Sequence, residues 1–169
     1  MRVWYDACTG KHMRYGVAVA KRLRELGHEV VLTTRKHPDT VPLARLLNEN
    51  FIVVGKYSPK SLLSRLRESV RRQLAFCKIF VEAVPDVAIS HGSVDQMRVA
   101  FGLGIPMITT VDTPYADAVH RLTLPLADYV VASKAIPKET LQKYNVKGKI
   151  VQFDGVDEVA WIRGFKPLV

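Results

Sequence analysis

Residues 105-IPMITTVDTPYADAVHRLTLPLADYVVAS-133 combine two short apolar runs with an amphipathic segment between them. The runs at 105–111 and 128–133 have the length and the β-branched content of buried strands, whereas 115–124 has helical spacing. A strand, a helix and a second strand in this order form one crossover unit of a parallel sheet. This stretch therefore predicts an α/β fold.

The same alternation runs along the whole chain. We expect strands at 2–6, 28–35, 51–55, 86–90, 105–111, 128–133 and 149–154. Helices are expected at 13–26, 41–49, 59–84, 93–103, within 115–124, from Pro137 onward and within 155–169. This pattern predicts a doubly wound, mostly parallel seven-stranded sheet of the Rossmann-like type, in the strand order 3-2-1-4-5-6-7.

Length and composition predict one globular domain, since the 169 residues are 48% hydrophobic and 24% charged. The chain has no apolar run near the roughly 20 residues that span a bilayer, and no signal-peptide pattern. Cys8 and Cys77 form neither a disulfide framework nor a metal-binding spacing, which favours a cytoplasmic protein with reduced thiols. The net charge of +9 favours partners that carry phosphate.

The first candidate site is 7-ACTGKH-12, which follows the first expected strand. This loop borders the point where the strand order reverses, and sheets of this type bind ligands there. Lys11 and His12, with the free N–H groups of the next helix, are predicted to bind an anion. The dinucleotide glycine fingerprint is missing, so the alternative is an ordinary turn with two solvated basic residues. Cys8 beside His12 also suggests a thiolate nucleophile.

The second candidate site is 90-SHGSVDQMR-98, after the fourth expected strand. His91 and Ser93 place an imidazole and a hydroxyl at a helix N-terminus, a combination that suits a sugar or a phosphate. The alternative is that Ser93 only caps its helix and that His91 lies in solvent.

The third candidate site begins at the end of the fifth expected strand, with Asp112 and Thr113. Asp117 then precedes His120 and Arg121 by three and four positions, so the three side chains share one helix face. A carboxylate beside an imidazole can act as a general acid or base. The alternative is a solvated face with a salt bridge.

The expected helix 59–84 is amphipathic and rich in arginine. Its apolar stripe is Leu62, Leu66, Val70, Leu74, Cys77 and Val81, and its polar side carries Arg65, Arg67, Arg71 and Arg72. A solvated helix face explains this pattern, and an anionic membrane surface is an alternative partner. Nucleic acid is not expected, because the polar side has few interleaved aromatic residues.

Seven stretches along the chain carry a family resemblance. They are 1-MRVWYD-6, 22-RLRELGHEVVLTTR-35, 86-DVAIS-90, 99-VAFGLGIPMI-108, 120-HRLTLPLAD-128, 136-IPKE-139 and 151-VQFDGVDEVAW-161. With them the chain resembles the DUF354 family, a group of uncharacterised archaeal and bacterial proteins similar to GT-B glycosyltransferases and UDP-N-acetylglucosamine 2-epimerases. The pair RLTLPLAD and FDGVDEVAW is the most specific part of the resemblance, since many GT-B proteins share ELGHEV.

The resemblance implies that 1–163 is the N-terminal, acceptor-side domain of a GT-B protein and that 164–169 begins an interdomain linker. In such proteins the nucleotide-sugar contacts come largely from a C-terminal domain, which we expect to lie outside these 169 residues. Against the Glu-Glu pair of the epimerases, this sequence has Ala116 and Asp117, so glycosyl transfer is expected rather than epimerisation. The alternative from another class is a non-catalytic domain that binds anionic partners through its basic helix.

We expect metal-independent transfer with no cofactor, in which a nucleotide sugar and a glycosyl acceptor are the substrates. Asp117 or His120 is the predicted catalytic base. Self-association as a homodimer and peripheral contact with a membrane stay open. The predicted substrate-binding residues are Lys11 and His12 at the donor phosphates, and His91, Ser93, Asp112, Thr113 and Arg121.

Overall fold

The computed structural model describes residues 1–58, 60–163 and 166. In this part of the chain, seven parallel strands form one sheet in the order β3-β2-β1-β4-β5-β6-β7, so the predicted fold class and strand order are confirmed. The strands are β1 (Arg2–Ala7), β2 (Glu29–Lys36), β3 (Phe51–Lys56), β4 (Val87–Ser90), β5 (Met107–Val111), β6 (Tyr129–Ser133) and β7 (Lys149–Phe153).

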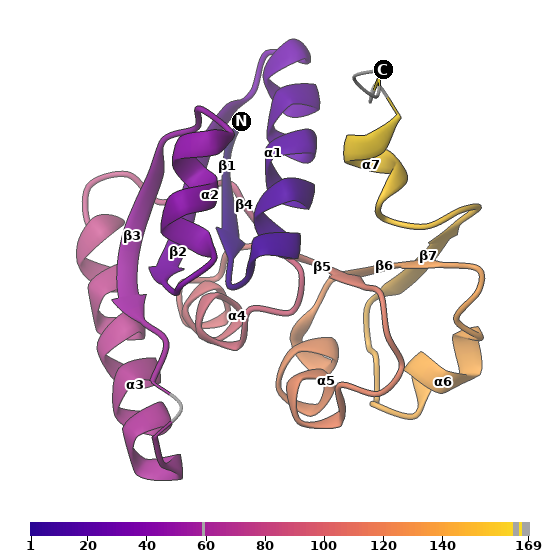
Figure 1. The fold of residues 1–169 in the computed structure, drawn as a ribbon. Helices are drawn as coiled ribbons and strands as arrows, with labels where there is room; N and C mark the ends of the chain where they lie inside the picture. The colour runs from indigo at the N-terminus through magenta and orange to yellow at the C-terminus, as the bar shows by residue number, and fades with distance from the viewer. Residues whose placement is uncertain (59, 164–165, 167–169) are drawn as a thin grey trace.

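Helices cover both faces of the sheet (Figure 1). The second and last helices both pack on the first, and the third and fifth both pack on the fourth. The helices are α1 (Gly10–Glu25), α2 (Thr40–Leu46), α3 (Leu62–Ile79), α4 (Val94–Gly102), α5 (Asp117–Thr123), α6 (Lys138–Gln142) and α7 (Val159–Ile162), with a 3₁₀ turn, η1, at Leu124–Leu126.

Strand β1 lies between β2 and β4 in the sheet and contributes side chains to two hydrophobic cores. Its successive residues Trp4 and Tyr5 are both fully buried but point to opposite faces, as strand geometry requires. Trp4 contacts Phe76 and Phe80 with ring centroids 4.7 and 4.6 Å away. Tyr5 packs with Met13 of α1 in the other core. These cores hold in place the strand ends that carry the polar residues of the candidate site.

Helix α1 begins three residues earlier than predicted, because Thr9 caps it by accepting a hydrogen bond from the backbone N–H of His12. Lys11 and His12 therefore lie in the first turn of α1 and not in a loop. The helix packs closely against β1, since Gly16 places its backbone against the Tyr5 ring, where a Cβ would lie 2.3 Å from Cε1.

Helix α3 is shorter than the predicted 59–84 and presents the opposite face to the core. Ser61 and Ser64 form a capping box at its start. The predicted apolar stripe faces solvent, with Leu62, Leu66 and Leu74 exposed by 81%, 62% and 58%. Arg72, predicted on the polar side, is instead buried with Phe76. The expectation about which face is buried was therefore wrong.

A buried charge at the centre of the sheet explains the orientation of α3. Both Arg72 Nη atoms donate to the carboxylate of Asp6, at 2.9 and 2.6 Å, and Arg72 Nε donates to the carbonyl oxygen of Val54 at 2.9 Å. A buried carboxylate is stable only with such partners, so α3 must point this side inward.

Among the described residues, no helix combines the length and the apolar composition that spanning a bilayer requires. The predicted linker 164–169 lies outside the described residues, except for Lys166.

Candidate functional site

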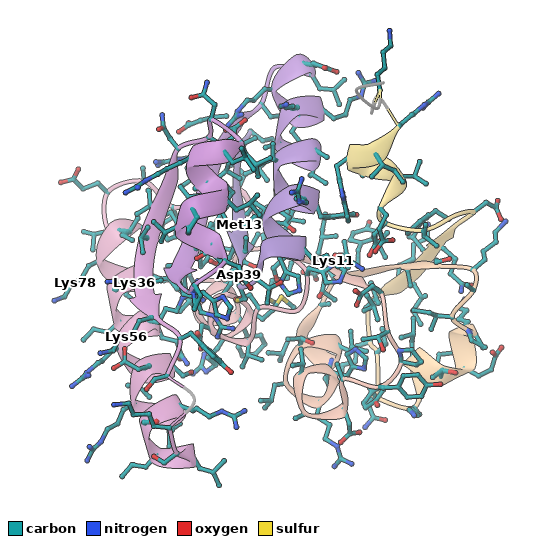
Figure 2. All side chains as sticks on the ribbon, viewed as in Figure 1. Lys11, Met13, Lys36, Asp39, Lys56 and Lys78 are labelled. Carbon is teal, nitrogen blue, oxygen red and sulfur yellow. The ribbon has the colours of Figure 1, made fainter. Side chains whose placement is uncertain are left out.

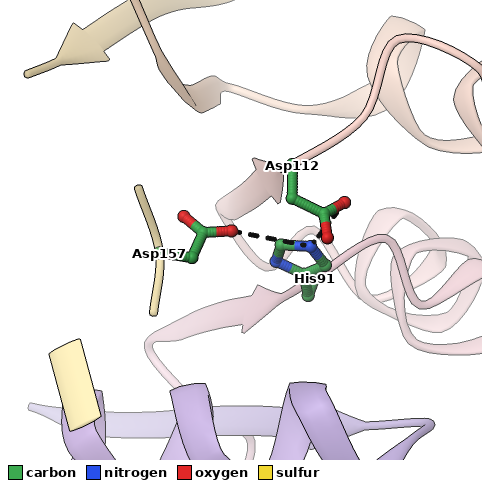
Figure 3. A group of neighbouring side chains, drawn as sticks. All are labelled: His91, Asp112 and Asp157. Carbon is green, nitrogen blue, oxygen red and sulfur yellow. Dashed lines mark ion pairs between the residues drawn. The ribbon is translucent and has the colours of Figure 1, made fainter. Parts of the chain in front are cut away.

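Polar side chains from three distant segments meet at the carboxyl edge of the sheet. His91 follows β4, Asp112 follows β5, and Asp157 lies between β7 and α7. Figure 3 shows the His91 ring near both carboxylates, with Nε2 3.0 Å from Oδ1 of Asp112 and 3.9 Å from Oδ2 of Asp157. Two of the loops singled out in the sequence therefore lie together, and a third segment joins them.

His91 is buried and is held by β5. Its Nδ1 lies 2.5 Å from Oγ1 of Thr110. Its Nε2 lies within ion-pair distance of Asp112, but the two groups are not aligned for a hydrogen bond. Gly92 follows with φ +70°, and a Cβ there would lie 3.0 Å from Val119, so the turn favours glycine. The alternative that placed His91 in solvent is wrong, because only 6% of the residue is exposed.

Lys11 neutralises the acidic side of this cluster. Its Nζ lies 2.5 Å from Oδ2 of Asp112, 2.9 Å from Oε1 of Glu158 and 3.8 Å from Oδ2 of Asp157. Although burial opposes it, hydrogen bonds to Asp112 and Glu158 raise the pKa of Lys11. The His91 imidazole and Lys11 hold the pKa of Asp112 well below its usual range, while burial raises the pKa of Asp157. A donor phosphate would have to compete with these carboxylates for Lys11.

The same cluster contains the types of donor atom that divalent cations bind. His91, Asp112 and Asp157 offer one imidazole nitrogen and two carboxylate oxygens within 4.8 Å of one another. Such a set suits zinc or a harder divalent ion. Because Lys11 already places an ammonium group against both carboxylates, a metal ion could bind only after displacing it.

A cavity of about 170 Å³ opens beside the cluster, and three histidines line it, His12, His91 and His120. Asp112 and Thr113 complete its polar wall. Nδ1 of His12 and Nδ1 of His120 are buried and have no hydrogen-bond partner among the described residues. Burial and the nearby His91 lower the pKa of His12 to about 3, and burial lowers the pKa of His120. Both imidazoles are therefore unprotonated at neutral pH, and each binds a proton more weakly than a free imidazole does.

His12 also lines a second, larger cavity of about 420 Å³ between α3 and the carboxyl ends of β1, β2 and β3. Thr9, Gly92 and Val119 lie in its wall as well. His12 is thus a shared wall of the two cavities, at the edge where doubly wound sheets bind their ligands.

Asp117 and Arg121 lie outside both cavities. Their ion pair, 2.8 Å between Nε and Oδ2, is exposed, and the two residues line a separate hollow with Lys143 and Tyr144. The predicted pairing of Asp117 with Arg121 is confirmed, whereas no hydrogen bond or ion pair joins Asp117 to His120 in the described structure. His120 instead packs its ring against Tyr144, 5.1 Å between centroids. The catalytic role of Asp117 or His120 stays a prediction.

The Ser93 hydroxyl makes its hydrogen bonds to other groups of the protein. It caps α4 by accepting a hydrogen bond from the backbone N–H of Gln96, and its hydroxyl donates to Asp6 at 2.5 Å. The capping alternative for Ser93 is therefore confirmed. Cys8 lies 3.8 Å from the Asp6 carboxylate, and burial raises the pKa of its thiol, which disfavours a thiolate nucleophile.

Sequence reasoning missed Asp157 and Glu158. Both follow β7, and their positions beside Lys11 depend on how the segment after the last strand returns toward α1. The signal that could have found them is the stretch FDGVDEVAW, which places two acids after a strand end.

Sequence comparison identifies the family of this chain. Residues 1–167 match the family described as "Protein of unknown function (DUF354)". The chain belongs to the DUF354 family. It is 31% identical over 170 residues to an uncharacterised protein of Methanocaldococcus jannaschii, covering 98% of this chain and 49% of that protein. This DUF354 chain thus spans about half the length of the curated relative that it matches.

Solved structures with the same fold include a UDP-N-acetylglucosamine 2-epimerase, with a TM-score of 0.71 and 15% identity, which aligns over 89% of this DUF354 chain and 47% of the epimerase. MurG of Acinetobacter baumannii has a TM-score of 0.62 and 17% identity, over 78% of this chain and 41% of MurG. Spinosyn forosaminyltransferase SpnP has a TM-score of 0.62 and 15% identity, over 92% of this chain and 51% of SpnP. At these identities the likeness shows the fold of the DUF354 chain, which is glycosyltransferase-like.

Proposed function

We propose that this chain is the acceptor-side domain of a nucleotide-sugar-dependent glycosyltransferase-like enzyme. The observation that carries the proposal is the placement of His12 between two cavities at the carboxyl edge of the sheet. A group that must take a proton from an acceptor has to contact both the acceptor and the reacting centre, and a shared wall allows that. The fold and the glycosyltransferase neighbours support the reaction class.

In this proposal an acceptor hydroxyl attacks the anomeric carbon of the sugar nucleotide. The bond between that carbon and the phosphate oxygen breaks, the nucleoside diphosphate leaves, and a base takes the hydroxyl proton. His12 is the base that we assign, because it lines both cavities. Its lowered pKa keeps the imidazole unprotonated at neutral pH but makes it a weaker base than a free imidazole. His120, which lines only the smaller cavity, is the second candidate. Asp117 ranks third, since Arg121 already pairs with it.

Asp112 and His91 are positioned to orient the acceptor. Both line the smaller cavity, and the Lys11 ammonium keeps the Asp112 carboxylate ionised. An ionised carboxylate accepts hydrogen bonds from sugar hydroxyl groups, so Asp112 can fix the acceptor while a neutral imidazole takes its proton.

The test measures release of nucleoside diphosphate from a panel of nucleotide sugars by the protein that contains this chain. We expect His12→Gln to lower kcat by a factor of about 10² or more, as removal of a general base does, and Asp117→Asn to lower it far less. Folding of each variant is checked by circular dichroism. Unchanged turnover in His12→Gln would remove His12 from the mechanism. Absence of both saturable sugar-nucleotide binding and turnover would refute the proposed reaction class.

A further inference from the structure

The larger cavity has a strongly basic lining. It lies between α3 and the ends of β1, β2 and β3, and the cations in its wall are Arg35, Lys56, Arg65 and Arg72. Arg72 is neutralised by the buried Asp6, with 2.6 Å between Nη2 and Oδ1. The other cations therefore decide the charge that a ligand in this cavity would meet.

The acids in the same wall do not compensate these cations. Glu68 pairs with Arg71 outside the cavity at 2.8 Å, and Asp95 accepts hydrogen bonds from Ser69 and Arg72. Among the described residues, no carboxylate lies within ion-pair distance of the remaining cations, which are Arg35, Lys56 and Arg65. A concave surface with uncompensated positive charge favours an anion.

Two contacts fix the position of the Arg35 side chain in the wall of this cavity. Its Nε donates to the carbonyl oxygen of Cys8 at 3.1 Å, and its guanidinium lies over the Tyr57 ring, 4.9 Å from the centroid. A guanidinium anchored through Nε keeps its terminal N–H groups available for a phosphate or a carboxylate. The first turn of α1 begins at the Thr9 cap in the same wall and contains no acidic residue, so its free N–H groups add to the positive potential.

Lys11 belongs to the other side of the site. Figure 2 labels Lys11 toward β5 and Lys56 toward α3, on opposite sides of the start of α1. The carboxylates of Asp112 and Glu158 neutralise Lys11, whereas Lys56 has no such partner among the described residues. The uncompensated charge therefore lies on the α3 side, away from the His91–Asp112 cluster.

We propose that the cavity beside α3 binds a phosphate or carboxylate group of the acceptor, with Arg35, Lys56 and Arg65 as its ligands. This proposal rests on the proposed function and names the class of acceptor, an anionic one. An acceptor anchored there by its anion extends past His12, the wall that the two cavities share, so that its hydroxyl lies in the smaller cavity beside Asp112.

The experiment titrates the 169-residue chain with glucose 6-phosphate, glucuronate and neutral glucose, at constant ionic strength, by calorimetry or by chemical-shift changes. We expect one or both anionic probes to bind and glucose to bind at least about tenfold more weakly, since one good charge-assisted contact is worth that factor. The phosphate and carboxylate arms tell which anion the cavity prefers.

The variants are Lys56→Gln and Arg65→Gln, and the matched control is Arg67→Gln. Lys56, Arg65 and Arg67 are all exposed, so the substitutions leave the core intact, and Arg67 lies on the same helix but does not line the cavity. Each cavity variant is expected to weaken binding of the anionic probe about tenfold, while the control keeps wild-type affinity.

Three outcomes would overturn the proposal. Equal affinity for the probes and glucose would remove the anion preference. If Arg67→Gln weakens binding of the anionic probe as much as the cavity variants do, the effect comes from net charge and not from the cavity. Displacement of the anionic probe by UDP would assign the cavity to the donor phosphates and not to the acceptor. These results do not depend on turnover. Anion binding by this chain, together with no release of nucleoside diphosphate from any nucleotide sugar by the protein that contains it, would therefore refute the proposed function alone.

Discussion

The Arg72→Met substitution leaves the buried carboxylate of Asp6 without its cation. Arg72 is 2% exposed and Asp6 is fully buried, and two hydrogen bonds of 2.6 and 2.9 Å join them. Removing one member of a buried ion pair costs about 3–5 kcal/mol. Ser93 and Thr33 still donate to Asp6, at 2.5 and 2.7 Å, so we expect the lower half of that range, about 3–4 kcal/mol.

Urea unfolding followed by circular dichroism measures this loss. With a slope of about 2 kcal/mol per molar urea, the midpoint should fall by about 1.5–2 M. Arg121→Met is the matched control, because it removes an arginine from an ion pair whose side chains are 72% and 57% exposed, and such pairs contribute less than about 1 kcal/mol. The Asp6→Asn, Arg72→Met double variant should be more stable than Arg72→Met alone. The reasoning fails if the two single arginine variants lose the same stability.

Three further predictions concern pH, packing and the exposed face of α3. The free energy of unfolding should decline as pH falls from about 6.5 toward 4, because the unfolded chain binds a proton at His12 that the folded chain, with a pKa of about 3, does not bind. His12→Gln should flatten this decline in urea titrations at each pH, and an unchanged slope in that variant would contradict the assignment. Gly16→Ala should lower the free energy of unfolding by about 1–3 kcal/mol, since its Cβ would lie 2.3 Å from the Tyr5 ring. The control Gly102→Ala meets only the flexible end of Arg98 at 3.2 Å and should be nearly neutral in thermal melts, so equal losses of stability in the two variants would show that the Tyr5 contact does not matter. Helix α3 carries exposed leucines beside Arg67, Arg71 and Lys78, a combination that predicts peripheral contact with an anionic membrane. The double variant Leu66→Asn, Leu74→Asn should then co-sediment less with anionic vesicles. If the double variant instead loses dimer formation and its vesicle binding is unchanged, the face serves self-association.

The sheet could be predicted because short β-branched runs that alternate with helical spacing leave few other architectures. The meeting of His91 and Asp112 could be predicted for a related reason: parallel strands end at one edge, and β4 and β5 are neighbours. The segment after β7 could not be placed, because packing against α1 sets its path, and local sequence does not encode that contact.

Helix α3 shows the limit of reading amphipathicity. Its periodicity predicts a helix with two different faces, and the helix is there. Hydropathy alone favours burying the leucines of this helix. The observed orientation is set instead by the contact between Arg72 and Asp6, which lie 66 residues apart in the chain. The sequence contains several arginines in this helix, and nothing in the pattern indicates that Arg72 is the buried one.

The carboxylate of Asp6 joins segments that lie far apart in the chain. β1 supplies it, and the donors come from β2, from α3 and from the start of α4, which belong to both halves of the doubly wound sheet. Opening either half alone would expose Asp6 to water while the other half still held its remaining donors. The two halves should therefore unfold as one cooperative unit, and the amides of β1 and β4 should exchange with solvent only when the whole domain opens.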